Sequence, residues 1–319
     1  MNIERTCVST PTAVLTKQQL KALTSTDDYT ALVHILLRLL LNCSLIFLLI
    51  QGSREDFYLG VLIVWIAYSA QFHFWGYAGI GHEFLHRRVF ASRWLNDFFY
   101  QFCSSVTWNN AAMFRDTHML HHRDTFSGED TEAKSVQNWG TRDLFRYLFV
   151  DLNGMFRKMY FVGVNSLGRY PNLEPLDSSY ANSARLTLAI NFLVYSFFYG
   201  VFQDAILTLL LIISPFSFSL CNKVLAKSQH HELQKWREGG PLKFSRTIIL
   251  PRFASFLYAN MNYHAEHHFF PAVPFYNLPK LHGILKDGGH DSAQTFHAFI
   301  AGDFQSVFSE STKEEDILV

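Results

Sequence analysis

Histidine is concentrated in three short stretches of this 319-residue chain, at spacings that suit metal binding. The first stretch follows the pattern H-x-x-x-H, and the second and third follow H-x-x-H-H. We call them box one (His82 and His86), box two (His118, His121 and His122) and box three (His264, His267 and His268). Residues three and four positions apart share one face of an α-helix, so each box can present its imidazoles as a cluster.

A further pair, His230 and His231, lies between box two and box three. Imidazole nitrogen suits zinc, iron, copper and nickel, and one ion takes three or four ligands from the protein. The eight boxed histidines, with one or two of the pair, are therefore too many for one ion and fit two ions.

The other five histidines are scattered: His34, His73, His282, His290 and His297. His73 lies about half a turn out of phase with box one, so we expect it to point away from that box and to pack elsewhere. We expect the last three of these histidines to lie on the surface.

The three boxes resemble those of the membrane fatty acid desaturase and hydroxylase superfamily. The matching segments are GHEFLHR at 81–87, FRDTHMLHH at 114–122 and NYHAEHHFFP at 262–271, followed by VPFYNLPKLH at 273–282. The resemblance implies a non-haem di-iron centre that uses O₂ to remove hydrogen from an unactivated C–H bond. By position, it implies that all eight boxed histidines are metal ligands and catalytic residues.

The resemblance also implies a ninth ligand before box three, and His230 occupies the expected place, with His231 as its rival. We expect the chain to continue as helix from the fourth apolar run through Glu232. Consecutive residues on a helix point about 100° apart, so both histidines of the pair can hardly face one iron. If neither is a ligand, Asn262 or a water completes the site.

Iron is favoured over zinc because no amino-acid side chain generates an oxidant strong enough for an alkyl C–H bond, and zinc has no redox chemistry. Metal-bound imidazoles need an acceptor for the second ring N–H. Five carboxylates in or beside the boxes are candidates for that role: Glu83, Asp116, Asp124, Glu232 and Glu266.

Apolar segments indicate the elements that hold the boxes. Charged residues make up 17% of the chain, less than the roughly 25% of a soluble domain. Four apolar runs have about the 20 residues that a membrane-spanning helix needs: 31–50, 57–80, 184–200 and 205–222. The sequence therefore predicts an all-α integral membrane fold, in which four transmembrane helices form two hairpins and a cytoplasmic helical cap carries the histidine-rich di-metal site.

We expect one membrane domain over 31–300, with polar segments at 1–30 and 301–319. An even number of crossings separates the boxes, so all of them meet on one side of the membrane. The two loops on the opposite side hold only Arg54, whereas lysine and arginine crowd 85–185 and 223–286. The positive-inside rule therefore places both termini and the active site in the cytoplasm.

The chain has 27 basic and 27 acidic residues, a balance that gives no indication of nucleic-acid binding. Its four cysteines form no C-x-x-C, and no haem, flavin or iron–sulfur motif is present to supply electrons. We therefore expect a separate electron donor of the ferredoxin or cytochrome b5 type, and a lipophilic substrate that enters from the bilayer.

Three other functions compete with a fatty acyl desaturase. A hydroxylase or ketolase of a small lipophilic metabolite would use the same di-iron site. The sequence His82-Glu83-Phe84-Leu85-His86 also matches the H-E-x-x-H motif of zinc metalloproteases, with Glu83 as general base, but that function leaves the other boxes without a purpose. A metal transporter or sensor would place its ligands within the spans rather than at their ends.

Overall fold

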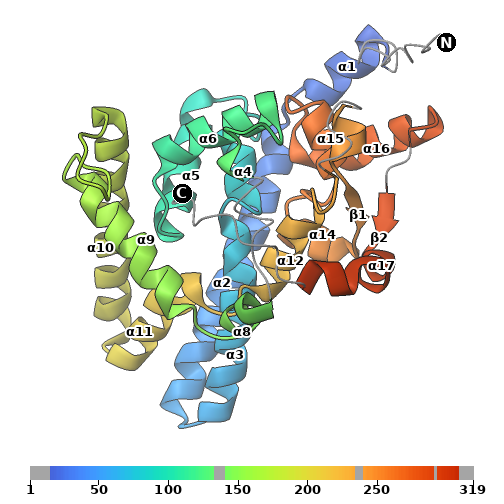
Figure 1. The fold of residues 1–319 in the computed structure, drawn as a ribbon. Helices are drawn as coiled ribbons and strands as arrows, with labels where there is room; N and C mark the ends of the chain where they lie inside the picture. The colour runs from blue at the N-terminus through green and yellow to red at the C-terminus, as the bar shows by residue number, and fades with distance from the viewer. Residues whose placement is uncertain (1–14, 133–140, 234–239, 291–292, 309–319) are drawn as a thin grey trace, which may run out of the picture.

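The computed structural model of the chain describes residues 15–132, 141–233, 240–290 and 293–308. The described part is mostly helical (Figure 1). Three segments are long and apolar enough to cross a membrane: α2 (Asp28–Arg54), the stretch Tyr58–Leu85, and α10 (Ser178–Phe202). The second of these contains α3 (Tyr58–Phe72) and α4 (Ile80–Leu85), and α3 lies beside α2.

The outer faces of these helices are apolar and uncovered by protein. Only 17% of the most apolar window of α2 and 11% of that of α10 is buried. Leu40 and Phe192, for example, are 63% and 71% exposed. Exposed apolar faces of this length match the hydrocarbon layer of a bilayer, so these helices are expected to face lipid.

The prediction of one continuous helix over 205–222 is wrong. α11 (Ala205–Ile213) passes into the short 3₁₀ helix η3 (Ser214–Phe216), and α12 (Leu220–Ser228) begins only after an interruption. Pro215 lacks the N–H that would continue the helical ladder, and Phe218 has a positive φ of 55°. The apolar part, Ala205–Phe216, is shorter than a full span, so the fourth crossing stays a prediction.

The second apolar segment is also interrupted, where it approaches box one. α3 is followed by the 3₁₀ helix η2 (His73–Trp75) and a turn that leads into α4. A Cβ atom at Gly79 would lie 2.1 Å from the carbonyl oxygen of Phe74, and one at Gly81 would lie 2.6 Å from that of Trp75. These two glycines therefore allow the close backbone approach that turns the end of the span into box one.

The remaining described helices are mostly short, and α9 runs beside α10 (Figure 1). They are α1 (Lys17–Thr24), α5 (Arg93–Val106), α6 (Ala111–Asp124), α8 (Thr141–Leu148), α9 (Leu152–Ser166), α13 (Pro241–Phe244), α14 (Arg252–Leu257), α15 (His264–Phe269), η5 (Phe275–Asn277), α16 (Leu278–Asp287) and α17 (Phe296–Phe308). β1 (Thr247–Ile249) and β2 (Ala293–Thr295) pair in parallel, with Thr247 opposite Ala293. The main apolar core includes Phe84 of α4, Leu281 of α16 and Leu23 of α1, so part of the N-terminal segment packs into the same core as α4 and α16.

Arg38 joins α2 to α14 and to the turn before box one. This side chain is 1% exposed, and its guanidinium donates to the carbonyl oxygens of Phe256 and Leu257, each at 2.6 Å, and of Phe74 at 3.3 Å. Phe256 and Leu257 end α14, which leads to box three, and Phe74 lies in the turn before box one. The arginine therefore holds the segments that precede box one and box three against α2. This role explains a charged residue within an apolar helix.

Candidate metal centre

The structure gathers nine histidines into two adjacent groups. Within each group, one nitrogen of every ring lies within 4.8 Å of the others. Group one contains His82, His86, His118, His122 and His267, and group two contains His121, His230, His264 and His268. The nine residues are the eight boxed histidines and one member of the pair.

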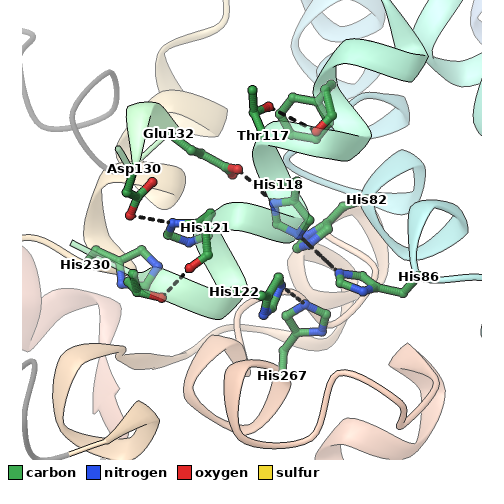
Figure 2. Close-up of polar contacts among 12 residues, drawn as sticks. His82, His86, Thr117, His118, His121, His122, Asp130, Glu132, His230 and His267 are labelled. Carbon is green, nitrogen blue, oxygen red and sulfur yellow. Dashed lines mark hydrogen bonds and ion pairs between the residues drawn. The ribbon is translucent and has the colours of Figure 1, made fainter. Parts of the chain in front are cut away.

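The two groups face each other closely enough to form one centre. The rings of His122 and His268, one from each group, stack with their centroids 4.3 Å apart. The centroids of His82 and His264 are 6.4 Å apart across the same boundary. Figure 2 shows histidines converging from α4 and its C-terminal end, from α6, from the turn after α12, and from α15.

Helical geometry divides boxes two and three between the groups. His118 and His122 are four residues apart on α6 and point about 40° apart, so they share group one, whereas His121 points into group two. The same holds on α15 for His264 and His268, which share group two, whereas His267 points into group one. The sequence predicts one cluster for each box, but the structure shows that each H-x-x-H-H box serves two sites.

The nitrogen atoms within each group lie at metal-ligand separations. The Nε2 atom of His118 is 2.7 Å from that of His82 and 3.2 Å from that of His86. In group two, the Nε2 atoms of His264 and His230 are 2.9 Å apart. Imidazoles that bind one ion at about 2.0–2.1 Å have nitrogens roughly 3 Å apart, so both groups have the size that an ion requires.

Hydrogen bonds fix three of the nine rings with their Nε2 lone pairs facing inward. The Nδ1 atom of His118 donates to Glu132 at 2.8 Å, that of His121 to Asp130 at 2.9 Å, and that of His230 to the Phe244 carbonyl at 2.9 Å. In a neutral ring, a proton on Nδ1 leaves Nε2 unprotonated. Facing lone pairs repel unless a cation lies between them, so this donor set fits a metal ion.

Burial keeps most of these rings uncharged. It is the largest cause that lowers the pKa of His230 to about 3, with a further contribution from His121. Burial and neighbouring histidines also lower the pKa of His122, His264 and His268 well below the usual value. Neutral imidazole is the form that binds metal, so the protein holds these side chains ready for an ion.

His121 differs from its neighbours because two carboxylates face it. Burial acts to lower its pKa, but Glu132 and Asp130 outweigh that effect, and the pKa is raised. A carboxylate behind a ligating histidine fixes the tautomer and makes the metal-facing nitrogen more basic. Asp130 is itself held in place, because its Oδ2 atom also accepts from the backbone N–H of Phe126 at 2.8 Å.

The turn after α12 brings His230 into group two, and the helix expected through Glu232 is wrong. α12 ends at Ser228, and Glu232 has a positive φ of 58°. The buried Arg246 stabilises this turn, because its guanidinium donates to the carbonyl oxygens of Ser228 and His231 at 2.8 and 3.3 Å. His231 belongs to neither group, and its ring lies near Phe299 of α17.

In the described structure, none of the five carboxylates expected to hold the ligating rings accepts a hydrogen bond from a ring of either group. Asp116 accepts from Tyr180, Asp124 from Arg123, and Glu232 lies 3.9 Å from His231. Glu83 is fully buried and 3.6 Å from His267 Nδ1, which is beyond hydrogen-bond distance. The acceptors that the structure shows, Asp130 and Glu132, follow box two by eight to ten residues in the acidic segment GEDTE.

The prediction of a surface position for His282 is wrong. The residue is 9% exposed, and its Nδ1 atom donates to Glu266 Oε1 at 2.6 Å. Thr247 of β1 donates to the other oxygen of Glu266. Box three is thus anchored to both β1 and α16. His73, as expected, packs elsewhere, with Nε2 2.7 Å from the Ser217 carbonyl oxygen, and His297 is exposed.

Asp130→Asn is expected to weaken metal binding by about 10–100-fold, because the neutral amide makes the His121 ring a poorer ligand. Competition against a chelator at fixed pH measures this affinity. Asp124→Asn is the matched control, since the Asp124 carboxylate pairs with the exposed Arg123 and touches no histidine of either group. Equal affinities for the two variants would contradict this role of Asp130.

Comparison with known protein families identifies the architecture. A model of the fatty acid desaturase family matches residues 56–299, a range that includes every histidine of the two groups. The chain belongs to the fatty acid desaturase family. A comparison with curated proteins finds no match. Family membership and the apolar helices indicate an integral membrane oxidoreductase of the desaturase or hydroxylase type, and the two histidine groups fit a metal site.

Proposed function

We propose that this family member is an O₂-dependent di-iron enzyme that removes hydrogen from unactivated C–H bonds of a lipophilic substrate, most simply a fatty acyl chain. The observation that carries the proposal is the division of nine histidines into two adjacent all-imidazole groups. Group one would hold one iron and group two the other. Iron ions bound there supply the oxidising power that no side chain has, with O₂ as co-substrate and electrons from outside the chain.

The protein's own residues position the ligand rings and exclude water from the site. The histidines of both groups are buried or half-buried, and acceptors fix the rings of His118, His121 and His230. Rings held in this way need little rearrangement to bind an ion or to keep it in place during turnover. Burial also excludes bulk water, which protects reactive species from side reactions.

The geometry disfavours a zinc protease. Such a site has three protein ligands and an open position for water. Here His82 and His86 share group one with three further histidines. Glu83, the general base of the protease mechanism, is fully buried and faces His267. These observations support the redox function instead.

A cavity in the membrane region supports a lipophilic substrate. Its volume is about 380 Å³, within the usual range for a small-molecule site, and it lies among α2, α3, α5 and α10. Phe72, Phe102 and Phe198 are among its mostly apolar lining residues, and Trp75, just before box one, forms part of its wall. An alkyl chain can enter this space from the bilayer and approach the end of the span that carries box one.

The experiment that tests this function is product analysis. Membranes containing the protein are incubated with acyl lipids, O₂ and a reductase with ferredoxin or cytochrome b5, and products are identified by mass spectrometry. Loss of two hydrogens indicates a desaturase, and gain of one oxygen indicates a hydroxylase, the second candidate. Peptide cleavage that depends on Glu83, with neither lipid product, would overturn the proposal.

The proposal includes an orientation with both termini and the active site in the cytoplasm. A tag inserted at Ser53, in the turn at the end of α2, is then expected to be inaccessible from the cytoplasmic side of sealed vesicles. Tags at the two termini are expected to be accessible there. Cytoplasmic access to the Ser53 tag would contradict the four-crossing topology.

A further inference from the structure

A second cavity lies against the outer side of group one. Its volume is about 210 Å³, and α9, α6 and the Trp108–Asn110 turn form its walls. Residues that line it include Tyr77, Asn109, Phe114, Arg157 and Lys158. The Phe114 ring stacks on that of His118, with centroids 5.5 Å apart, so this α9 pocket and group one share a wall.

The α9 pocket combines apolar walls with positive charge. Trp108, Met113, Phe114 and Phe161 provide the apolar walls. Lys158 Nζ donates to Asn109 Oδ1 at 2.9 Å and to the Thr107 carbonyl at 3.3 Å, which are both neutral acceptors. Within the described ranges, no carboxylate forms an ion pair with Lys158.

Asp151, the acidic group that acts to raise the Lys158 pKa, is already engaged. Asp151 pairs with Arg146 at 3.0 Å and accepts from the backbone N–H of Gly154 at the start of α9. The cations Arg157 and Lys223 add to the positive potential at Lys158. Burial is the main cause that lowers the Lys158 pKa to about 7, and these two cations lower it further. An anion in the pocket would relieve this unfavourable environment.

We propose that the α9 pocket binds the anionic head group of a lipophilic substrate, with Lys158 and Arg157 opposite its carboxylate or phosphate. This inference rests on the proposed function, because the bound molecule is taken to be the substrate of the di-metal centre. A carboxylate would come from a free fatty acid, and a phosphate from a phospholipid or an acyl carrier. The pocket is too small for a whole lipid, so it holds the head and the first part of the chain.

The test compares three amphiphiles with the same twelve-carbon chain: dodecanoate, dodecyl phosphate and dodecanol. Binding to the full-length, iron-loaded protein in detergent is measured by calorimetry below pH 7, where Lys158 is mostly protonated. Lys158→Gln is expected to weaken binding of the preferred anion about 10-fold or more and to leave dodecanol unchanged. Because partition into detergent is the same for every variant, the ratio of variant to wild-type affinity is the readout.

Two further variants keep the test decisive. Arg157→Gln changes an exposed side chain and is expected to fold, with the same selective loss for anions. Lys280→Gln, at an exposed lysine on α16, is the matched control and is expected to bind all three compounds as the wild type does. The stronger of the two anions in the wild type identifies the source of the head group.

Equal loss of affinity for all three compounds, or no loss in either pocket variant, would overturn the head-group site. In the two pocket variants, a rise in the KM for an acidic electron donor with unchanged amphiphile binding would also overturn the head-group site. That result would show that Lys158 and Arg157 bind the electron donor. Selective anion binding by a protein that oxidises no lipid would instead support the pocket and count against the proposed function, so the two failures are distinguishable.

Discussion

His230→Ala is expected to lose one of two irons and reduce turnover below detection, whereas His231→Ala keeps both irons and most of the activity. His230 Nε2 lies 2.9 Å from His264 Nε2 in a group of four histidines, so its loss removes a quarter of that ligand set. His231 lies outside both groups, near Phe299. Iron content of the purified proteins, by elemental analysis, measures the difference.

The two variants control for each other, because they remove the same side chain from adjacent buried positions of one turn. Membrane insertion and thermal unfolding are compared to separate metal loss from misfolding. Full iron content in both variants would assign the ninth position to another group, such as Asn262, whose buried Oδ1 has no hydrogen-bond partner in the described structure. Iron loss in His231→Ala alone would contradict the structure directly.

His267→Ala and His268→Ala are each expected to abolish turnover while removing different irons. The two residues are neighbours on α15, yet His267 faces group one and His268 faces group two. Since a change behind a ligand already costs about 10–100-fold, removal of the ligand itself should cost at least about 100-fold in activity. Each single variant is expected to retain about one iron per chain.

Double variants separate the two groups. His86→Ala combined with His267→Ala removes two ligands of group one, so it is expected to retain the iron of group two. His267→Ala combined with His268→Ala damages both groups and is expected to lose both irons. Non-additive effects are expected within a group, because its members act on one ion. Loss of both irons in the within-group double variant would argue against two separate ligand sets.

Sequence spacing predicts which histidines meet, because helix periodicity limits where their side chains point. Helix periodicity predicts that only one of His230 and His231 faces a shared site, and the choice of His230 comes from the family resemblance rather than from spacing. The division of each H-x-x-H-H box follows helix geometry once two groups are known to lie on either side of α6 and α15, but spacing alone does not reveal that arrangement, because residues from other elements complete each group. The sequence predicts the three longest apolar helices for a similar reason, since bilayer thickness sets a length that apolar runs reveal.

The remaining differences arise from loops. Asp130 and Glu132 reach His121 and His118 only because the chain turns back after α6, where Phe126 has a positive φ of 63°. His282 meets Glu266 because η5 and α16 return to α15. Tertiary contacts of this kind leave no periodic signal. Pro215, in contrast, indicates from the sequence alone that the helix over 205–222 is interrupted, because proline lacks the N–H of a helical hydrogen bond.

The proposed function requires two irons in one protein chain. Its most direct test is metal analysis of the wild-type protein purified in mild detergent, combined with Mössbauer spectroscopy of the ⁵⁷Fe-loaded form. We expect two irons per chain in nitrogen-rich sites, one held by group one and one by group two. One zinc per chain, with no iron bound even after anaerobic loading, would contradict this expectation.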